Sequence, residues 1–128
     1  MANMAFCSDG TRLSELSIKN RYTASLREKY EGINYTLPCE GCGDASVHND
    51  HTIAKARCKV IHKTELIWNP NNYVRSCETC HRQWEGFKSG EWVNHHNMES
   101  RLKFLKEHDP EGYTVRIELT RAALEENK

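Results

Sequence analysis

The sequence predicts a small α+β fold in which two short strands and a helix surround a four-cysteine zinc site, with further helices on either side. Three observations lead to this prediction: two Cys-x-x-Cys pairs, an order of strand, loop, strand and helix around them, and an apolar stripe of helical spacing near the N-terminus. The chain has 128 residues and is expected to form one domain, residues 1–128. Only 38% of its residues are hydrophobic, so a bound ion would stabilise a thin core.

Residues 11–31 are expected to form the N-terminal helix. Ile18, Tyr22, Leu26 and Tyr30 follow one another at intervals of four residues, which places them on one face of a helix. The simplest interpretation is an amphipathic supporting helix.

The centre of the fold is expected within residues 37–88. A short strand near Ala45 to His51 follows a turn that contains glycine, and "NYVRS", residues 72–76, reads as a second strand. Residues 52–71, between the two strands, have weak periodicity and are expected to form a long loop. From Cys77 the sequence "CETCHRQWEGFKSG" fits a helix that ends near Gly90.

A C-terminal helix and a strand are expected over residues 91–119. Met98, Leu102 and Leu105 form one stripe of a helix over residues 91–108, which "HDPEG" then breaks. Residues 113–119 alternate strictly between apolar and polar side chains, which is typical of a strand with one buried face.

Four cysteines have the spacing of a structural zinc site. Two residues between a pair of cysteines allow both thiolates to reach one ion, and two such pairs complete a tetrahedral sphere. One pair lies on a glycine-containing turn, and the other at a helix start, where the helix dipole favours thiolates. The duplicated spacing argues against the alternative of free or redox-active thiols. The four ligands are Cys39, Cys42, Cys77 and Cys80.

The two remaining cysteines, Cys7 and Cys58, have no partner at this spacing. They are interpreted as small apolar residues.

A second set of residues resembles the HNH nucleases. An Asp-His pair (Asp50 and His51) follows the first cysteine pair, Asn72 comes five residues before the second, and His81 comes directly after Cys80. The resemblance covers about residues 37–88. The basic segment between the strands and the flanking helices also look like those of small phage-borne members.

The resemblance implies a ββα-metal finger with an active site. Asp50 and His81 would ligate a divalent ion, His51 would be the general base, and Asn72 would orient the His51 ring through a hydrogen bond. A carboxylate and an imidazole accept several metals, so magnesium or manganese is expected, with nickel or zinc as alternatives.

The same residues suit phosphodiester hydrolysis on chemical grounds. Neighbouring residues of a strand point to opposite faces, so Asp50 can serve an ion while His51 serves a water molecule. An imidazole takes a proton from water near neutral pH, and a divalent ion neutralises the charge that grows on the phosphate and on the leaving 3′ oxygen.

Each of these residues also has a purely structural interpretation. Asp50 can cap a turn, His51 can act only through a hydrogen bond, and His81 can support the zinc site from outside its first sphere. The spacing to Cys77 selects Asn72 over Asn69 and Asn71.

Other histidines and aromatic residues are left outside the expected site. His48 shares the strand face of Asp50 and is either an extra ligand or a solvated side chain. His95 and His96 are interpreted as surface or packing residues. Trp84 and Phe87 are interpreted as core residues rather than as groups that stack on bases.

The charge pattern suggests where DNA binds. The chain has 18 Lys and Arg and 18 Asp and Glu, but residues 52–64 contain bases and no acid. Basic side chains contact phosphates and position DNA without reading its sequence, although an ordinary solvated face is the alternative. The candidates are Lys55, Arg57, Lys59, Lys63 and Arg82.

The sequence therefore predicts a metal-dependent DNA endonuclease that nicks DNA, acting alone, as a homodimer or with a phage protein partner. The alternatives are a non-catalytic zinc-stabilised module that binds DNA or a protein, and an accessory nuclease of a phage packaging or recombination complex. Neither a secretory signal nor a membrane segment is recognisable, so a cytoplasmic location, the host cytoplasm for a phage protein, is expected.

Overall fold

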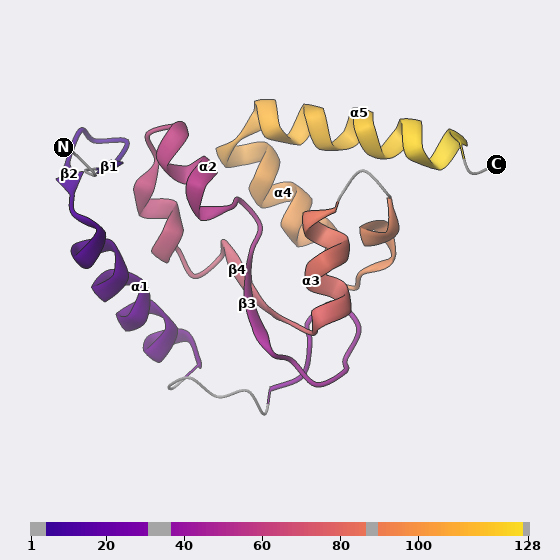
Figure 1. Ribbon diagram of the computed structural model, residues 1–128, viewed down its shortest axis with the longest axis horizontal. Helices are drawn as coiled ribbons and strands as arrows, with labels where there is room; N and C mark the ends of the chain where they lie inside the picture. Colours follow the sequence, from indigo (N-terminus) through magenta and orange to yellow (C-terminus); the bar gives the residue numbers. More distant parts are fainter. Residues whose placement is uncertain (1–4, 31–36, 87–89, 127–128) are drawn as a thin grey trace. The chain divides into compact units, whose positions relative to one another are not determined.

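The computed structural model describes residues 5–30, 37–86 and 90–126 (Figure 1). The regular elements of these residues are helices and two small two-stranded sheets, which confirms the α+β class. The chain divides into two compact units, one of residues 1–34 and 53–73 and the other of residues 35–52 and 74–128. Phe87, which the sequence analysis assigned to the core, lies outside the described residues.

The first unit is built around helix α1 (Glu15–Tyr30). This helix confirms the expected N-terminal helix over residues 15–30, but the expected start at residue 11 was wrong, because residues 12–13 form a strand. Ile18 and Leu26 of the apolar stripe are buried. Strands β1 (Ala5–Phe6) and β2 (Arg12–Leu13) pair antiparallel ahead of the helix. The 3₁₀ helix η1 (Thr64–Trp68) packs against α1.

The segment between the two central strands is helical, and the expectation of a long loop over residues 52–71 was wrong. Helix α2 (Lys55–Val60) and η1 occupy most of it and pack against each other. Helix α2 has only six residues, of which Cys58 alone is buried. A helix this short does not repeat its buried face, so its periodicity is not visible in the sequence.

The second unit contains the strand and helix that hold the candidate site. Strand β3 (His48–His51) pairs with β4 (Tyr73–Ser76), and helix α3 (Glu78–Glu85) follows β4 directly and packs against β3. This strand, strand and helix order confirms the expected one. The 3₁₀ helix η3 (Glu91–Asn94) and helix α4 (Met98–His108) come next.

The last element is helix α5 (Pro110–Glu126), which packs against α4, and the strand expected over residues 113–119 was wrong. The "HDPEG" sequence starts a helix: Asp109 Oδ1 accepts a hydrogen bond from Gly112 N (3.1 Å), and Pro110 is the first helical residue. The buried positions are polar, Arg116 and Thr120, so the apolar alternation does not mark the buried face.

Trp84 of α3 is the centre of the second unit's core. Its ring is 2% exposed and lies 3.8 Å from the guanidinium carbon of Arg101 and 3.7 Å from that of Arg116. Two cations this close to one ring centre cannot share a face, so the ring is held between them. Arg101 belongs to α4 and Arg116 to α5, so both C-terminal helices are fixed to α3 through this side chain.

Asn72 fixes the main chain of the first unit. Its amide oxygen accepts from Ile53 N (2.7 Å), and its amide nitrogen donates to Ile53 O (3.1 Å) and Leu66 O (2.9 Å). The residue is completely buried. These bonds tie the start of the segment between the strands to η1.

We predict that Asn72→Ala lowers the free energy of unfolding by about 2–4 kcal/mol, because it leaves buried main-chain groups without partners. Urea denaturation monitored by circular dichroism measures this change. The matched control is Asn71→Ala, since Asn71 is exposed and its loss should change stability by less than about 0.5 kcal/mol. Equal effects of the two substitutions would contradict the prediction.

Candidate functional site

The four cysteines of the two Cys-x-x-Cys pairs gather at one point in the second unit. Their sulfur atoms all lie within 4.8 Å of one another, and those of Cys42 and Cys77 are 3.6 Å apart. The group can therefore hold one metal ion. Cys77 is the N-cap of α3, where its sulfur accepts a hydrogen bond from Cys80 N (3.4 Å), as the expected placement of thiolates at a helix start requires.

The turn of the first pair is shaped for close approach of the sulfurs. Gly41 N donates to Cys39 Sγ (3.3 Å), and Gly43 adopts a φ of 87°, which glycine tolerates. A Cβ at residue 41 would lie 3.2 Å from Cys80 Sγ and 3.6 Å from Cys39 Sγ. The small residue thus lets the main chain pass beside the two sulfurs.

The thiols of the cluster differ in acidity. Burial acts to raise the pKa of Cys39, but hydrogen bonds from main-chain groups of Cys77, Cys42 and Gly41 outweigh it and lower this pKa to about 7. Burial, followed by hydrogen bonding to the other three thiols, raises the pKa of Cys80. A metal ion bound by all four sulfurs would therefore release protons from the thiols that are still protonated.

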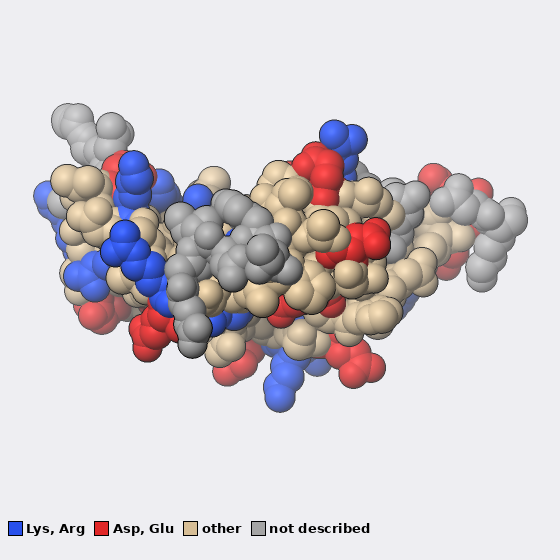
Figure 2. Space-filling view, turned by 90° about the horizontal axis from the view of Figure 1, so that it is seen from below, with Lys and Arg blue, Asp and Glu red and all other residues tan. Residues whose placement is uncertain are grey.

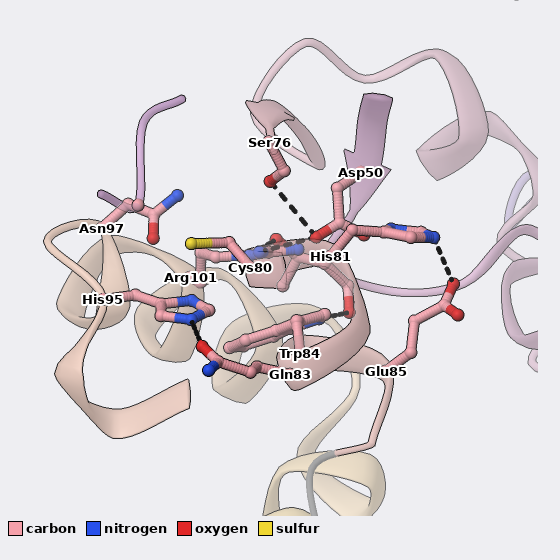
Figure 3. A network of polar contacts seen from close by, with 12 residues as sticks. Asp50, Ser76, Cys80, His81, Gln83, Trp84, Glu85, His95, Asn97 and Arg101 are labelled. Atoms are coloured by element: carbon pink, nitrogen blue, oxygen red, sulfur yellow. Dashed lines mark hydrogen bonds and ion pairs between the residues drawn. The ribbon is translucent and has the colours of Figure 1, made fainter. Parts of the chain in front are cut away.

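A second group of ligand atoms lies beside the first. Asp50 of β3 and His81 of α3 face each other, with Asp50 Oδ1 3.1 Å from His81 Nδ1 (Figure 3). Glu85, one turn further along α3, lies 3.5 Å from His81 Nε2, and the three residues have ligand atoms within 4.8 Å of one another. The structure thus brings together the carboxylate and the imidazole that the sequence analysis assigned to a divalent ion.

The geometry of this pair fits a shared ion. Two neighbouring ligands of an octahedral ion, each about 2.1 Å from it, are about 3 Å apart, close to the 3.1 Å between Asp50 Oδ1 and His81 Nδ1. A proton on Nε2, which lies 3.5 Å from Glu85 Oε1, would leave Nδ1 with a lone pair for an ion. In the other tautomer Nδ1 donates to Oδ1, so the 3.1 Å separation suits a hydrogen bond as well as a shared ion.

The other carboxylate oxygen of Asp50 is already bound. Asp50 is 2% exposed, and its Oδ2 accepts hydrogen bonds from Arg101 Nη1 (3.0 Å) and Ser76 Oγ (3.4 Å). Figure 3 shows Ser76 and Arg101 directed at one oxygen of Asp50 and the His81 ring on the other side of the carboxylate. One oxygen is therefore held by the protein, and one faces the imidazole.

His48 of β3 holds the ring of His81, and Glu78 of α3 holds His48. The ring of His48 stacks on it, with centroids 4.3 Å apart and planes inclined by 23°. His48 Nε2 in turn pairs with Glu78 Oε2. His48 is thus placed against His81, and its stacking restricts how that ring can turn.

His51 lies where the strand pattern predicts, but Asn72 does not make the hydrogen bond to the His51 ring that was expected. His51 ends β3 next to Asp50 and is half-buried, as a strand neighbour of a buried residue should be. The expectation that Asn72 bonds to the His51 ring was wrong, because its amide bonds to the main chain of Ile53 and Leu66 instead. Asn72 acts on the backbone that follows β3.

The basic candidates lie on short helices and take part in weak contacts. Lys55 Nζ lies 4.8 Å from the centre of the Tyr22 ring, and Lys59 pairs with Glu15. Arg57 is half-buried on α2, and Lys63 precedes η1. Arg82, on α3 of the second unit, pairs with Glu78 (2.8 Å). Exposed ion pairs of this kind contribute about 0–1 kcal/mol to stability.

Comparison with known proteins identified no relative. The chain matches no family model, no curated protein and no solved structure. Among the described residues, no helix is both long and apolar enough to cross a membrane.

Three residues near the site were missed by sequence reasoning. Glu85 has a recognisable signal, because it follows His81 by four residues on a helix and therefore shares its face. Ser76 and Arg101 have no recognisable sequence signal, because strand pairing and helix packing bring them close to Asp50. His95, which was left out, is buried, and a Cβ on Gly41 would lie 3.5 Å from its ring.

We predict that the protein binds about one zinc ion per chain and that Cys80→Ser abolishes this binding, because three sulfurs no longer complete the tetrahedron. Metal analysis of the purified protein, with thermal unfolding before and after chelation, measures both effects. Cys7→Ala is the control, since Cys7 is a buried cysteine outside the cluster and its loss should leave the zinc content unchanged. Full zinc content in Cys80→Ser would contradict the prediction.

Proposed function

We propose that the protein is a metal-dependent DNA endonuclease of the HNH type that nicks DNA by hydrolysing phosphodiester bonds. The observation that supports this most directly is the facing pair of Asp50 and His81 beside the cysteine cluster, with His51 next to Asp50 on the same strand. A module that used its zinc only as a scaffold would not need a carboxylate, two imidazoles and Glu85 in this arrangement.

The four cysteines would hold a structural zinc ion. Asp50 Oδ1 and His81 Nδ1 would hold a catalytic divalent ion, magnesium or manganese, with nickel or zinc as alternatives. Such an ion supplies positive charge to a scissile phosphate and to the leaving 3′ oxygen. Glu85, at the far nitrogen of the ring, would accept a hydrogen bond from Nε2 and so leave Nδ1 as the ligand atom.

His51 acts on the nucleophile. Its imidazole takes a proton from a water molecule as the water oxygen forms a bond to phosphorus, and the bond from phosphorus to the 3′ oxygen breaks. Asp50 and His51 alternate along β3, so the ion ligand and the base point to different faces and do not compete for one group. Asn72 supports this arrangement by fixing the main chain at Ile53, two residues after His51.

The charge of each unit indicates which part binds the DNA backbone. The first unit has nine Lys and Arg against five Asp and Glu, and the second has nine against thirteen. The first unit therefore has a net charge of +4 and the second −4. Figure 2 shows Lys and Arg side chains over α1, and α2 contributes Lys55, Arg57 and Lys59 to the same unit. We assign phosphate contacts to the first unit.

We predict that the zinc-loaded protein relaxes supercoiled plasmid when magnesium or manganese is added, and that His51→Ala lowers the rate about 10²–10⁴-fold through loss of the general base. Asp50→Asn and His81→Ala should also lose activity. The control is His96→Ala, an exposed histidine that the proposal does not use. A wild-type protein that fails to nick with any divalent ion would reject the function and favour the binding module.

We also predict that Lys55→Ala and Arg57→Ala each weaken DNA binding in a salt-dependent manner. Each lost phosphate contact should reduce the slope of log affinity against log salt concentration by about one. Fluorescence anisotropy with a labelled duplex at several salt concentrations measures this slope. Lys103→Ala, an exposed lysine of the acidic second unit, is the control and should leave it unchanged. Equal slopes for all variants would contradict the assignment.

A further inference from the structure

We propose that Arg101 is a positioning residue for the divalent-ion site. Its guanidinium holds one oxygen of Asp50, so that the other oxygen faces His81. This inference rests on the proposed function, because it assumes that Asp50 is an ion ligand. Arg101 lies on α4, outside the 37–88 segment that carries the HNH resemblance, and nothing in the spacing of that segment involves it.

The guanidinium group is fixed at two points on the same stretch of chain. Its Nη1 donates to Asp50 Oδ2 (3.0 Å), and its Nε donates to Thr52 Oγ1 (2.9 Å). Two bonds from one planar group set both the position and the tilt of that plane. Because Asp50 and Thr52 are two residues apart, Arg101 links the carboxylate to the backbone that carries it.

Burial makes this contact strong and rigid. The side chains of Arg101 and Asp50 are both only 2% exposed, so solvent hardly screens the pair. The guanidinium also lies 3.8 Å from the centre of the Trp84 ring. Burial lowers the pKa of Arg101, and the charge of Asp50 opposes this shift. A buried carboxylate that loses such a partner is left uncompensated.

The consequence for an ion is a restricted carboxylate. Arg101 and Ser76 both donate to Oδ2, so Oδ1 is the oxygen that remains for the ion at His81. The carboxylate cannot rotate without breaking the bond to Arg101. Partners of this kind, which orient a ligand without touching the ion, typically change metal affinity or activity about 10–100-fold when they are removed.

Arg116 provides a matched control within the same core. It is also buried, lies 3.7 Å from the centre of the Trp84 ring, and donates to the carbonyl oxygen of Trp84 (3.1 Å). Asp50 accepts hydrogen bonds from Arg101 and Ser76 and faces His81. Arg116 donates to Trp84 instead, and Asp50 acts on it through its charge, which opposes the lowering of the Arg116 pKa by burial. Loss of Arg116 therefore removes a comparable stack and charge without releasing the carboxylate.

The test compares manganese binding by the zinc-loaded, full-length protein. Electron paramagnetic resonance of free Mn²⁺ gives the dissociation constant for wild type, Arg101→Met, Arg116→Met, Arg101→Lys and the reference variant Asp50→Asn. We expect Arg101→Met to weaken binding about 10–100-fold and Arg116→Met to change it less than about threefold. Arg101→Lys should recover part of the affinity, because an ammonium group keeps the positive charge near Asp50 but lacks the planar fork that holds Asp50 and Thr52 together.

Equal losses in Arg101→Met and Arg116→Met would overturn the inference and leave Arg101 as a packing residue. If Arg101→Met does not fold, Thr52→Val replaces it in the test. This substitution keeps the side-chain shape and removes one of the two hydrogen-bond partners of the guanidinium, so it should weaken Mn²⁺ binding several-fold. Unchanged binding would overturn the inference.

A wild type that binds Mn²⁺ at Asp50 without nicking plasmid rejects the proposed function alone. A wild type that does not bind Mn²⁺ at Asp50 rejects both.

Discussion

The cysteine cluster at the start of α3 is the constraint on which the second unit depends. Cys77 caps the helix and Cys80 lies in its first turn, so the cluster fixes where the helix begins and how it is turned. His81 follows Cys80 directly and therefore takes its position from the same turn. The facing pair of His81 and Asp50 is a consequence of this placement together with the packing of α3 on β3.

A chain of buried charged and aromatic groups completes the unit. Asp50, Arg101, Trp84 and Arg116 follow one another through an ion pair and two cation–π contacts. Burial lowers the pKa of Arg116 to about 9, with the charge of Arg101 acting in the same direction. Burying these cations costs desolvation energy. What the arrangement provides is a defined position for β3, α3, α4 and α5 relative to one another.

The parts of the fold that were predictable from sequence have local signals. The cysteine spacing, the strand, strand and helix order, and the stripe of α1 each depend on residues close in the chain. Helix α2 was missed because a six-residue helix shows no repeat, and α5 was missed because its buried positions are Arg116 and Thr120. In the site, Asp50 and His81 were predictable from their neighbours, whereas Arg101 and the partners of Asn72 depend on packing between distant segments.

The junction at Asp109 has a practical consequence for fragments of this chain. Asp109 N bonds to Leu105 O at the end of α4, and its carboxylate caps α5, so a single residue joins the two helices. A fragment of residues 37–88 alone would lack Arg101 and Arg116, which enclose the Trp84 ring. It would also lose the ion pair between Arg101 and Asp50. Residues 37–88 are thus not expected to keep this core by themselves. Grafting them onto another protein would require helices α4 and α5 as well.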